Sequence, residues 1–243
     1  MDFPGAFKHL GSFYSRGGKT DILVPDNNKV FYRRNLPHLQ PMGGLFFVTY
    51  MLHGAIPRQV NEQWRREREE ELIQLMAQET KDSFAELKNI VDRKFWLKQE
   101  KYLDNRKDGP FYFKDDKLAQ VAVESLFFWD NRKIEVICFC GMPNHIHAVL
   151  RTMRPDEVEG GMKVALNNIM HSIKRHSANR CNKLLNKVGR FWQEESFDRL
   201  VRDRKELSKT ILYIINNPVK AGFCQSPKDW KWNYIKPDYN EFM

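Results

Sequence analysis

Cysteine is scarce in this sequence: only four occur among 243 residues, and no two of them form a Cys-x-x-Cys pair. This spacing argues against a zinc knuckle and still more against a disulfide framework, so we expect reduced thiols among apolar neighbours. Long hydrophobic runs are also missing. No eighteen apolar residues follow one another, and the first twenty residues contain no continuous apolar core. These absences predict a soluble, cytoplasmic protein that does not act at a membrane.

A nucleotide-binding P-loop is absent as well, and neither an internal repeat nor a low-complexity tract is present. Acidic residues are outnumbered, because 31 Asp and Glu stand against 40 Lys and Arg, which gives a formal net charge of +9. Such an excess favours a polyanionic partner such as nucleic acid. A basic surface that only keeps the protein soluble would have the same composition.

Hydrophobic patterning divides the first half of the chain into three parts. Residues 1–43, rich in Gly, Pro, Asn and basic side chains, are typical of an irregular basic arm. Residues 44–53 are a β-branched and aromatic run that predicts the first strand. Residues 58–108 are dense in Glu, Lys and Arg, with apolar residues three and four apart, which predicts a pair of amphipathic helices with solvated outer faces and no catalytic role.

In the second half, segments with the apolar spacing of helices alternate with segments that have the apolar pattern of strands. It predicts a helix from about residue 116, strands at 133–142 and 144–152, a basic amphipathic helix within 161–189, a short strand within 190–203 and a final helix that stops near Pro218. This order predicts an α+β fold, in which helices pack on a mainly antiparallel sheet and a helical insertion follows the first strand. We assign the domain itself to residues 44–223 and a C-terminal tail to residues 224–243.

Two histidines stand one residue apart in the strand "NHIHAVLRT". Side chains at i and i+2 of a strand share a face, so His145 and His147 are adjacent, while Ile146 and Ala148 point the other way. Two adjacent imidazoles form half of a metal site. A solvent-facing pair without any ligand would have the same spacing.

The final helix carries two further polar residues. Tyr213 and Asn217 are four residues apart, so they lie on one helical face about one turn from each other. Asn217 could simply terminate the helix before Pro218, and Tyr213 in "ILYII" could be a core aromatic. Together with the histidines, however, they form a coherent set. A divalent metal held by two imidazoles and an amide oxygen can polarise a phosphate, which a phenol oxygen can then attack.

These residues resemble a known family, the HUH-type single-tyrosine DNA transposases, and in particular the REP-associated tyrosine transposases. Four segments carry the resemblance, in the family's order and spacing: "YRRNLPHLQPMGGLFFVTYMLHGAIP", "MPNHIHAVL", "RFWQEESFDRLVRD" and "YIINNPVKAGF". They extend from about Tyr32 to Phe223. A match of four segments in order is far more specific than a single His-x-His.

The resemblance implies a ferredoxin-like or RRM-like antiparallel sheet with helices on one side. It implies metal-dependent cleavage and joining of single-stranded DNA next to a hairpin, as in transposition. His145 and His147 match the ligands of Mg²⁺ or Mn²⁺, and Asn217 matches the third ligand. Tyr213 matches the nucleophile, which becomes linked to the 5′ phosphate and leaves a free 3′ hydroxyl.

Two alternative functions would also account for some of these residues. A noncatalytic RRM-like binder would use sheet aromatics such as Phe46 and Tyr50, and a metal phosphodiesterase would use water in place of Tyr213. Relatives act as monomers or as dimers with the tyrosine in trans, so a homodimer stays open.

The expected partner is single-stranded DNA with a hairpin. Basic residues of the arm and of the basic helix are the candidate DNA-binding residues: Arg33, Arg34, Lys174, Arg175, Arg180 and Lys183.

Overall fold

The main sheet of the protein has five strands, in the order β6-β3-β5-β4-β7, and every neighbouring pair is antiparallel. The structure is a computed structural model that describes residues 29–33, 37–78 and 83–242. The strands are β3 (Leu45–Met51), β4 (Ile134–Met142), β5 (His145–Thr152), β6 (Phe197–Leu200) and β7 (Asn233–Ile235).

Two helices connect these strands in the ferredoxin-like manner. Helix α3 (Asp116–Phe127) follows β3 in the domain and leads to β4, and α4 (Leu166–Leu184) connects β5 to β6. The resulting β-α-β-β-α-β order is that of the ferredoxin-like fold. Asp115 caps α3 by accepting a hydrogen bond from the backbone of Lys117. The predicted fold class, α+β with helices packed on an antiparallel sheet, is confirmed.

The two faces of the sheet bury different residues of the same strands. Phe46, Val48 and Tyr50 of β3 belong to a core shared with α3 and α4. Leu45 and Phe47 point the other way, into a core shared with α5 (Arg204–Ile215). The crossover helices therefore lie on one face, as expected, but α5 covers the opposite face. The expectation of helices on one side only was wrong, because the face opposite α3 and α4 also carries apolar residues, among them Phe47 of β3 and Val149 of β5, which α5 buries.

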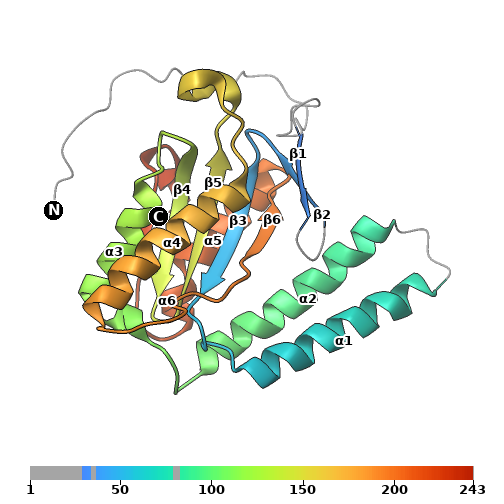
Figure 1. The fold of residues 1–243 in the computed structure, drawn as a ribbon, viewed down its shortest axis with the longest axis horizontal. Helices are drawn as coiled ribbons and strands as arrows, with labels where there is room; N and C mark the ends of the chain where they lie inside the picture. The colour runs from blue at the N-terminus through green and yellow to red at the C-terminus, as the bar shows by residue number, and fades with distance from the viewer. Residues whose placement is uncertain (1–28, 34–36, 79–82, 243) are drawn as a thin grey trace.

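Between β3 and α3 the chain forms the helical insertion that the sequence predicts. It consists of α1 (Arg58–Met76) and α2 (Phe84–Asn105), which lie side by side as an antiparallel hairpin extending away from the sheet (Figure 1). Ser83 and Glu86 form a capping box at the start of α2. The buried surface of the hairpin includes Trp64 of α1 and Val91 of α2. Its outer face is charged, which accounts for the composition of residues 58–108.

Additional elements lie before and after the predicted domain. Strands β1 (Lys29–Arg33) and β2 (Pro37–Pro41) form an antiparallel pair, so this part of the arm is not irregular, and Arg34 lies outside the described residues. Strand β7 extends the sheet into the region expected as a tail. The short helices are α6 (Asn217–Lys220) and the 3-10 helices η1 (Tyr112–Lys114), η2 (Pro155–Glu157), η3 (Glu159–Gly161), η4 (Pro227–Asp229) and η5 (Pro237–Phe242).

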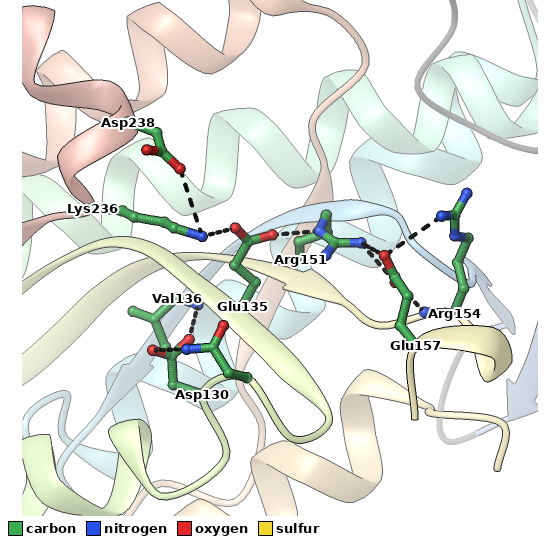
Figure 2. Close-up of polar contacts among 9 residues, drawn as sticks. Asp130, Glu135, Val136, Arg151, Arg154, Glu157, Lys236 and Asp238 are labelled. Carbon is green, nitrogen blue, oxygen red and sulfur yellow. Dashed lines mark hydrogen bonds and ion pairs between the residues drawn. The ribbon is translucent and has the colours of Figure 1, made fainter. Parts of the chain in front are cut away.

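An ion-pair network fastens one end of the sheet (Figure 2). Glu135 of β4 accepts a hydrogen bond from Arg151 of β5 at 2.5 Å and also pairs with Lys236, which follows β7. Arg151 continues the network to Glu157 at 2.9 Å. The network therefore connects the segment after β7 to β4 and β5. Within the described part of the chain, no helix is long and apolar enough to cross a membrane.

Candidate active site

His145 and His147 lie side by side on β5, between β3 and β4, on the face that α5 covers. Their Nε2 atoms are 2.9 Å apart, and the two side chains are 1% and 0% exposed. The spacing therefore has the consequence predicted from the strand period. The alternative of a solvent-facing pair is excluded, because both rings are buried.

The other nitrogen of each ring is held by a neighbouring side chain. His145 Nδ1 is 2.6 Å from Asn144 Oδ1, and His147 Nδ1 is 2.9 Å from Thr49 Oγ1. Trp96 of α2 donates its indole N–H to the same Thr49 oxygen at 3.4 Å. Nδ1 of His145 is thus the donor to Asn144, which leaves the lone pair of its Nε2 directed at His147. Such outer contacts are typical of metal-binding histidines.

A carboxylate from the helical insertion completes this cluster. Glu100 of α2 places its Oε2 3.0 Å from His147 Nε2, and its side chain is only 3% exposed. One ligand atom each from Glu100, His145 and His147 lie within 4.8 Å of one another. The segment 58–108, expected to have no catalytic role, therefore contributes a buried carboxylate to the site.

Tyr213 and Asn217 approach the cluster from α5 and α6. The Tyr213 hydroxyl donates a hydrogen bond to Glu100 Oε2 at 2.7 Å, and its ring centroid is 5.8 Å from that of His147. Helix α5 ends at Ile215 rather than at Pro218, so Asn217 begins α6. Asn216 between them keeps a helical conformation, with φ −85° and ψ −2°, so the two residues remain one turn apart.

Several buried polar atoms of this site have no hydrogen-bond partner in the described structure. They are Oε1 of Glu100 and both side-chain atoms of Asn217, which is 1% exposed. Asn217 lies near enough to Tyr213 to lower the pKa of its phenol, although its amide atoms make no hydrogen bond within the described residues. Buried polar groups are nearly always paired, with water or a ligand if not with protein. Their grouping here therefore indicates a site that binds something.

Aromatic rings enclose the polar cluster. Trp96 stacks on Phe197 of β6 with ring centroids 5.6 Å apart and contacts Tyr213 edge to face at 5.3 Å. Phe47 stacks on His147 at 5.9 Å. These rings limit access of water and fix the rotamers of the polar side chains.

Burial and mutual contacts set the charges of the site. Burial lowers the pKa of His145 to about 3, assisted by His147, so His145 is neutral, which is the form that binds metals. Burial and the Glu100 carboxylate raise the pKa of Tyr213, so its phenol is protonated. Burial alone would raise the pKa of Glu100, but contacts with His147, His145 and Tyr213 leave it below its ordinary value. Glu100 is therefore ionised.

Sequence reasoning missed Glu100, Trp96, Thr49 and Asn144. The only available signal for α2 is that Trp96, Glu100 and Leu103 recur at helical spacing, which places them on one face. In a segment dense in Glu and Lys, that face is indistinguishable from a solvated one. Asn144 stands inside the segment "MPNHIHAVL" and could have been noticed as a neighbour of His145.

The candidate DNA-binding residues lie elsewhere. Arg33 ends β1, and the four on α4 belong to the helix on the sheet face opposite to the histidines. Lys174 donates to the backbone oxygen of Glu194 at 2.8 Å, and Arg180 pairs with Glu124 at 2.8 Å.

The sheet aromatics invoked for a noncatalytic binder are not available for stacking. Phe46 and Tyr50 are 1% and 0% exposed and contribute to the core beneath α3 and α4. Stacking of bases requires exposed rings on the sheet face. That alternative therefore loses the residues on which it depended.

Comparison with known proteins identifies the region that carries this geometry. Residues 113–217 match the family described as "Transposase IS200 like". Over 109 residues the chain is 26% identical to a REP-associated tyrosine transposase of Haemophilus influenzae, a match that covers 43% of this chain and 60% of that protein. A solved structure of a REP-associated tyrosine transposase bound to a REP hairpin is 16% identical, with a TM-score of 0.47 and coverage of 83% and 80% of the two chains. The family match and the curated relative confirm the resemblance predicted from the sequence: this chain is similar to the IS200-like and REP-associated tyrosine transposases over the region that contains its histidine pair and Tyr213.

Proposed function

We propose that this chain is a metal-dependent single-stranded DNA endonuclease and strand transferase that acts next to hairpin DNA through a covalent 5′-phosphotyrosine intermediate. One observation carries the proposal. The hydroxyl of Tyr213 and the paired imidazole nitrogens of His145 and His147 converge, through Glu100, on one buried cluster. The similarity to tyrosine transposases supports the same chemistry.

The donor set fits a divalent cation. His145 and His147 each direct Nε2 inward, and Asn217 supplies a buried amide oxygen that has no partner in the described structure. Imidazoles are better ligands for Mn²⁺ than for Mg²⁺, which is held more strictly by oxygen, so we expect both ions to be accepted and Mn²⁺ to bind more tightly. When bound, the cation would polarise the phosphate and offset the negative charge that develops during cleavage.

The proposed cleavage is balanced in atoms and protons. The Tyr213 oxygen forms a bond to phosphorus, and the bond between phosphorus and the 3′ oxygen of the preceding nucleotide breaks. The phenol loses its proton, and the released 3′ oxygen takes one up. Attack by a 3′ hydroxyl on the phosphotyrosine reverses these changes and joins strands, so no ATP is required. This agrees with the missing P-loop.

We further propose that hairpin binding uses basic residues outside this cluster. The arm at residues 1–43 and the exposed basic side chains of α4 are the candidates. Phosphate contacts supply most of the affinity in such complexes, so binding and cleavage should be separable by mutation.

The test is a search for a covalent protein–DNA adduct. The protein is incubated with labelled hairpin oligonucleotides that carry single-stranded flanks, taken from the surroundings of its own gene, in Mg²⁺ or Mn²⁺. Wild type should give a denaturant-resistant adduct, and Tyr213→Phe should reduce it by at least roughly a thousandfold, as expected when a nucleophile is lost. Tyr112→Phe, which also removes one phenol oxygen, is the matched control.

Three results would contradict the proposal. Cleavage without any adduct, retained in Tyr213→Phe, would favour the phosphodiesterase that uses water. Full activity in EDTA would exclude the metal. A DNA-linked peptide that contains a tyrosine other than Tyr213 would overturn the assignment of the nucleophile.

A further inference from the structure

We propose that Glu100 of the helical insertion is a ligand of the divalent cation, so that the insertion is part of the metal site rather than an appendage. The inference rests on the metal dependence proposed above and adds to it. The matching residues of the family supply two imidazoles and an amide. Here a carboxylate reaches the same cluster from a helix that lies outside residues 113–217, the region similar to the family.

The position of the Glu100 carboxylate is that of a ligand. Its Oε2 lies 3.0 Å from His147 Nε2, and its ligand atom, with those of His145 and His147, falls within a span of 4.8 Å. Its second oxygen, Oε1, is buried and has no partner among the described residues. A carboxylate that is only 3% exposed is costly to bury in its charged form unless a positive charge lies beside it. A cation between the imidazoles would supply that charge.

The charge of the donor set also favours Glu100 as a ligand. Two imidazoles and an amide supply no negative charge, and such a set binds weakly to Mg²⁺ and Mn²⁺, which prefer anionic oxygen. One buried carboxylate supplies the missing negative charge. Glu100 is the carboxylate that the described structure places in reach of both histidines.

Contacts on both sides of Glu100 hold it in place. One turn before it, Trp96 packs between Phe197 and Tyr213 and donates to Thr49. One turn after it, Asp104 pairs with Lys220 of α6 at 3.1 Å. Helix α2 is thus attached to β3, β6 and α6 around the site. A side chain oriented by such neighbours is preorganised for binding, unlike a surface glutamate that meets the site by chance.

The experiment measures metal binding without DNA. Mn²⁺ is titrated into the full chain by calorimetry, and thermal unfolding is followed with Mn²⁺ and with EDTA. Glu100→Gln keeps the shape of the side chain and removes its charge, and should weaken Mn²⁺ binding by at least about tenfold. His147→Ala should abolish binding. Glu67→Gln, on the exposed face of α1 beside Lys98, is the matched control and should bind Mn²⁺ as wild type does.

The outcomes separate this inference from the proposed function. If Glu100→Gln binds Mn²⁺ like wild type while His147→Ala does not, Glu100 is not a ligand but the metal site stands. If wild type binds no Mn²⁺, both proposals fall. Should Glu100→Gln prove unfolded in EDTA, crystals of the unchanged protein soaked in Mn²⁺ decide the matter. A Glu100 oxygen at about 2.1 Å from the ion supports the inference, and a carboxylate turned away from the ion overturns it.

Discussion

At the scale of single residues, the site is defined by polar atoms that are buried before any ligand arrives. An unpaired buried polar group costs about 1–3 kcal/mol. Asn217 carries this cost at both of its amide atoms. Its neighbour Asn216 is exposed and donates to the backbone oxygen of Leu212 at 2.8 Å, as an ordinary helix-terminal asparagine does. Of the two adjacent asparagines, Asn216 therefore pairs with the helix end, whereas the buried amide of Asn217 is left available to a ligand.

Asn217→Ala should impair cleavage in a way that depends on metal concentration. Because the lost amide oxygen would be one of several ligands, raising Mn²⁺ should restore part of the activity. The free energy of unfolding in EDTA should not decrease, because no hydrogen bond is lost and an unpaired buried amide is removed. Cleavage rates across a Mn²⁺ series and urea unfolding measure the two effects.

Asn216→Ala serves as the control for this prediction and should need no additional Mn²⁺. An Asn217→Ala protein whose lost activity does not respond to Mn²⁺ would show that the amide acts on something other than the metal.

At the scale of elements, the most extensive ion-pair network described lies away from the candidate site and joins β4, β5 and the segment after β7 (Figure 2). Glu135 is its centre, with a side chain 17% exposed, between Arg151 and Lys236. Burial raises the pKa of Glu135, but these two cations together lower it below its ordinary value of 4.5. The network is therefore a stabilising feature of the sheet that depends on pH.

Glu135→Gln should destabilise the protein by about 2 kcal/mol at neutral pH, because charged hydrogen bonds are lost in a partly buried place. A carboxyl whose pKa is lower in the folded than in the unfolded state stabilises above its unfolded pKa, and this contribution is lost as pH falls through the folded value. The difference between wild type and variant should therefore be constant above about pH 5 and shrink below pH 4.5. Urea unfolding at several pH values measures it.

The control is Glu124→Gln, which removes an exposed pair with Arg180 and should cost less than about 1 kcal/mol. If Glu135→Gln shows an equally small effect, or one that does not change with pH, the network contributes little to stability.

At the scale of the whole molecule, the sheet separates two surfaces. The histidine pair faces α5, whereas the basic helix α4 covers the opposite face. A hairpin bound along α4 would have to pass its single-stranded flank around an edge of the sheet to reach Tyr213. Binding and chemistry are thus expected to depend on different residues.

Replacing Lys174, Arg175, Arg180 and Lys183 together by alanine should weaken hairpin binding and leave Mn²⁺ binding unchanged. Each phosphate contact contributes roughly 0.9 to the slope of log affinity against log salt concentration. Since Lys174 and Arg180 already donate to protein oxygens, we expect the slope to decrease by about two units rather than four. Binding curves at several salt concentrations measure this change.

A second variant removes four positive charges from the insertion at Arg65, Arg66, Lys94 and Lys98 and changes the net charge equally. An equal loss of affinity and slope in both variants would mean that overall charge, and not the surface of α4, governs DNA binding.

The sequence by itself determined the local geometry of the site. Period two in a strand places His145 and His147 on one face, and the helical period places Tyr213 and Asn217 one turn apart. The order of the elements was sufficient for the α+β class with helices packed on a mainly antiparallel sheet. The ferredoxin-like topology was implied by the family resemblance. The helical pair at residues 58–108 followed from its spacing of apolar residues.

Only the tertiary structure decided which distant groups meet these residues. Glu100 precedes His145 by 45 positions, and nothing in a charged amphipathic helix distinguishes a buried glutamate from its solvated neighbours. Its burial depends on the packing of Trp96 against β6 and on the pair between Asp104 and Lys220, which join segments far apart in the chain. Periodicity describes one element at a time, whereas the environment of a side chain depends on the elements packed around it.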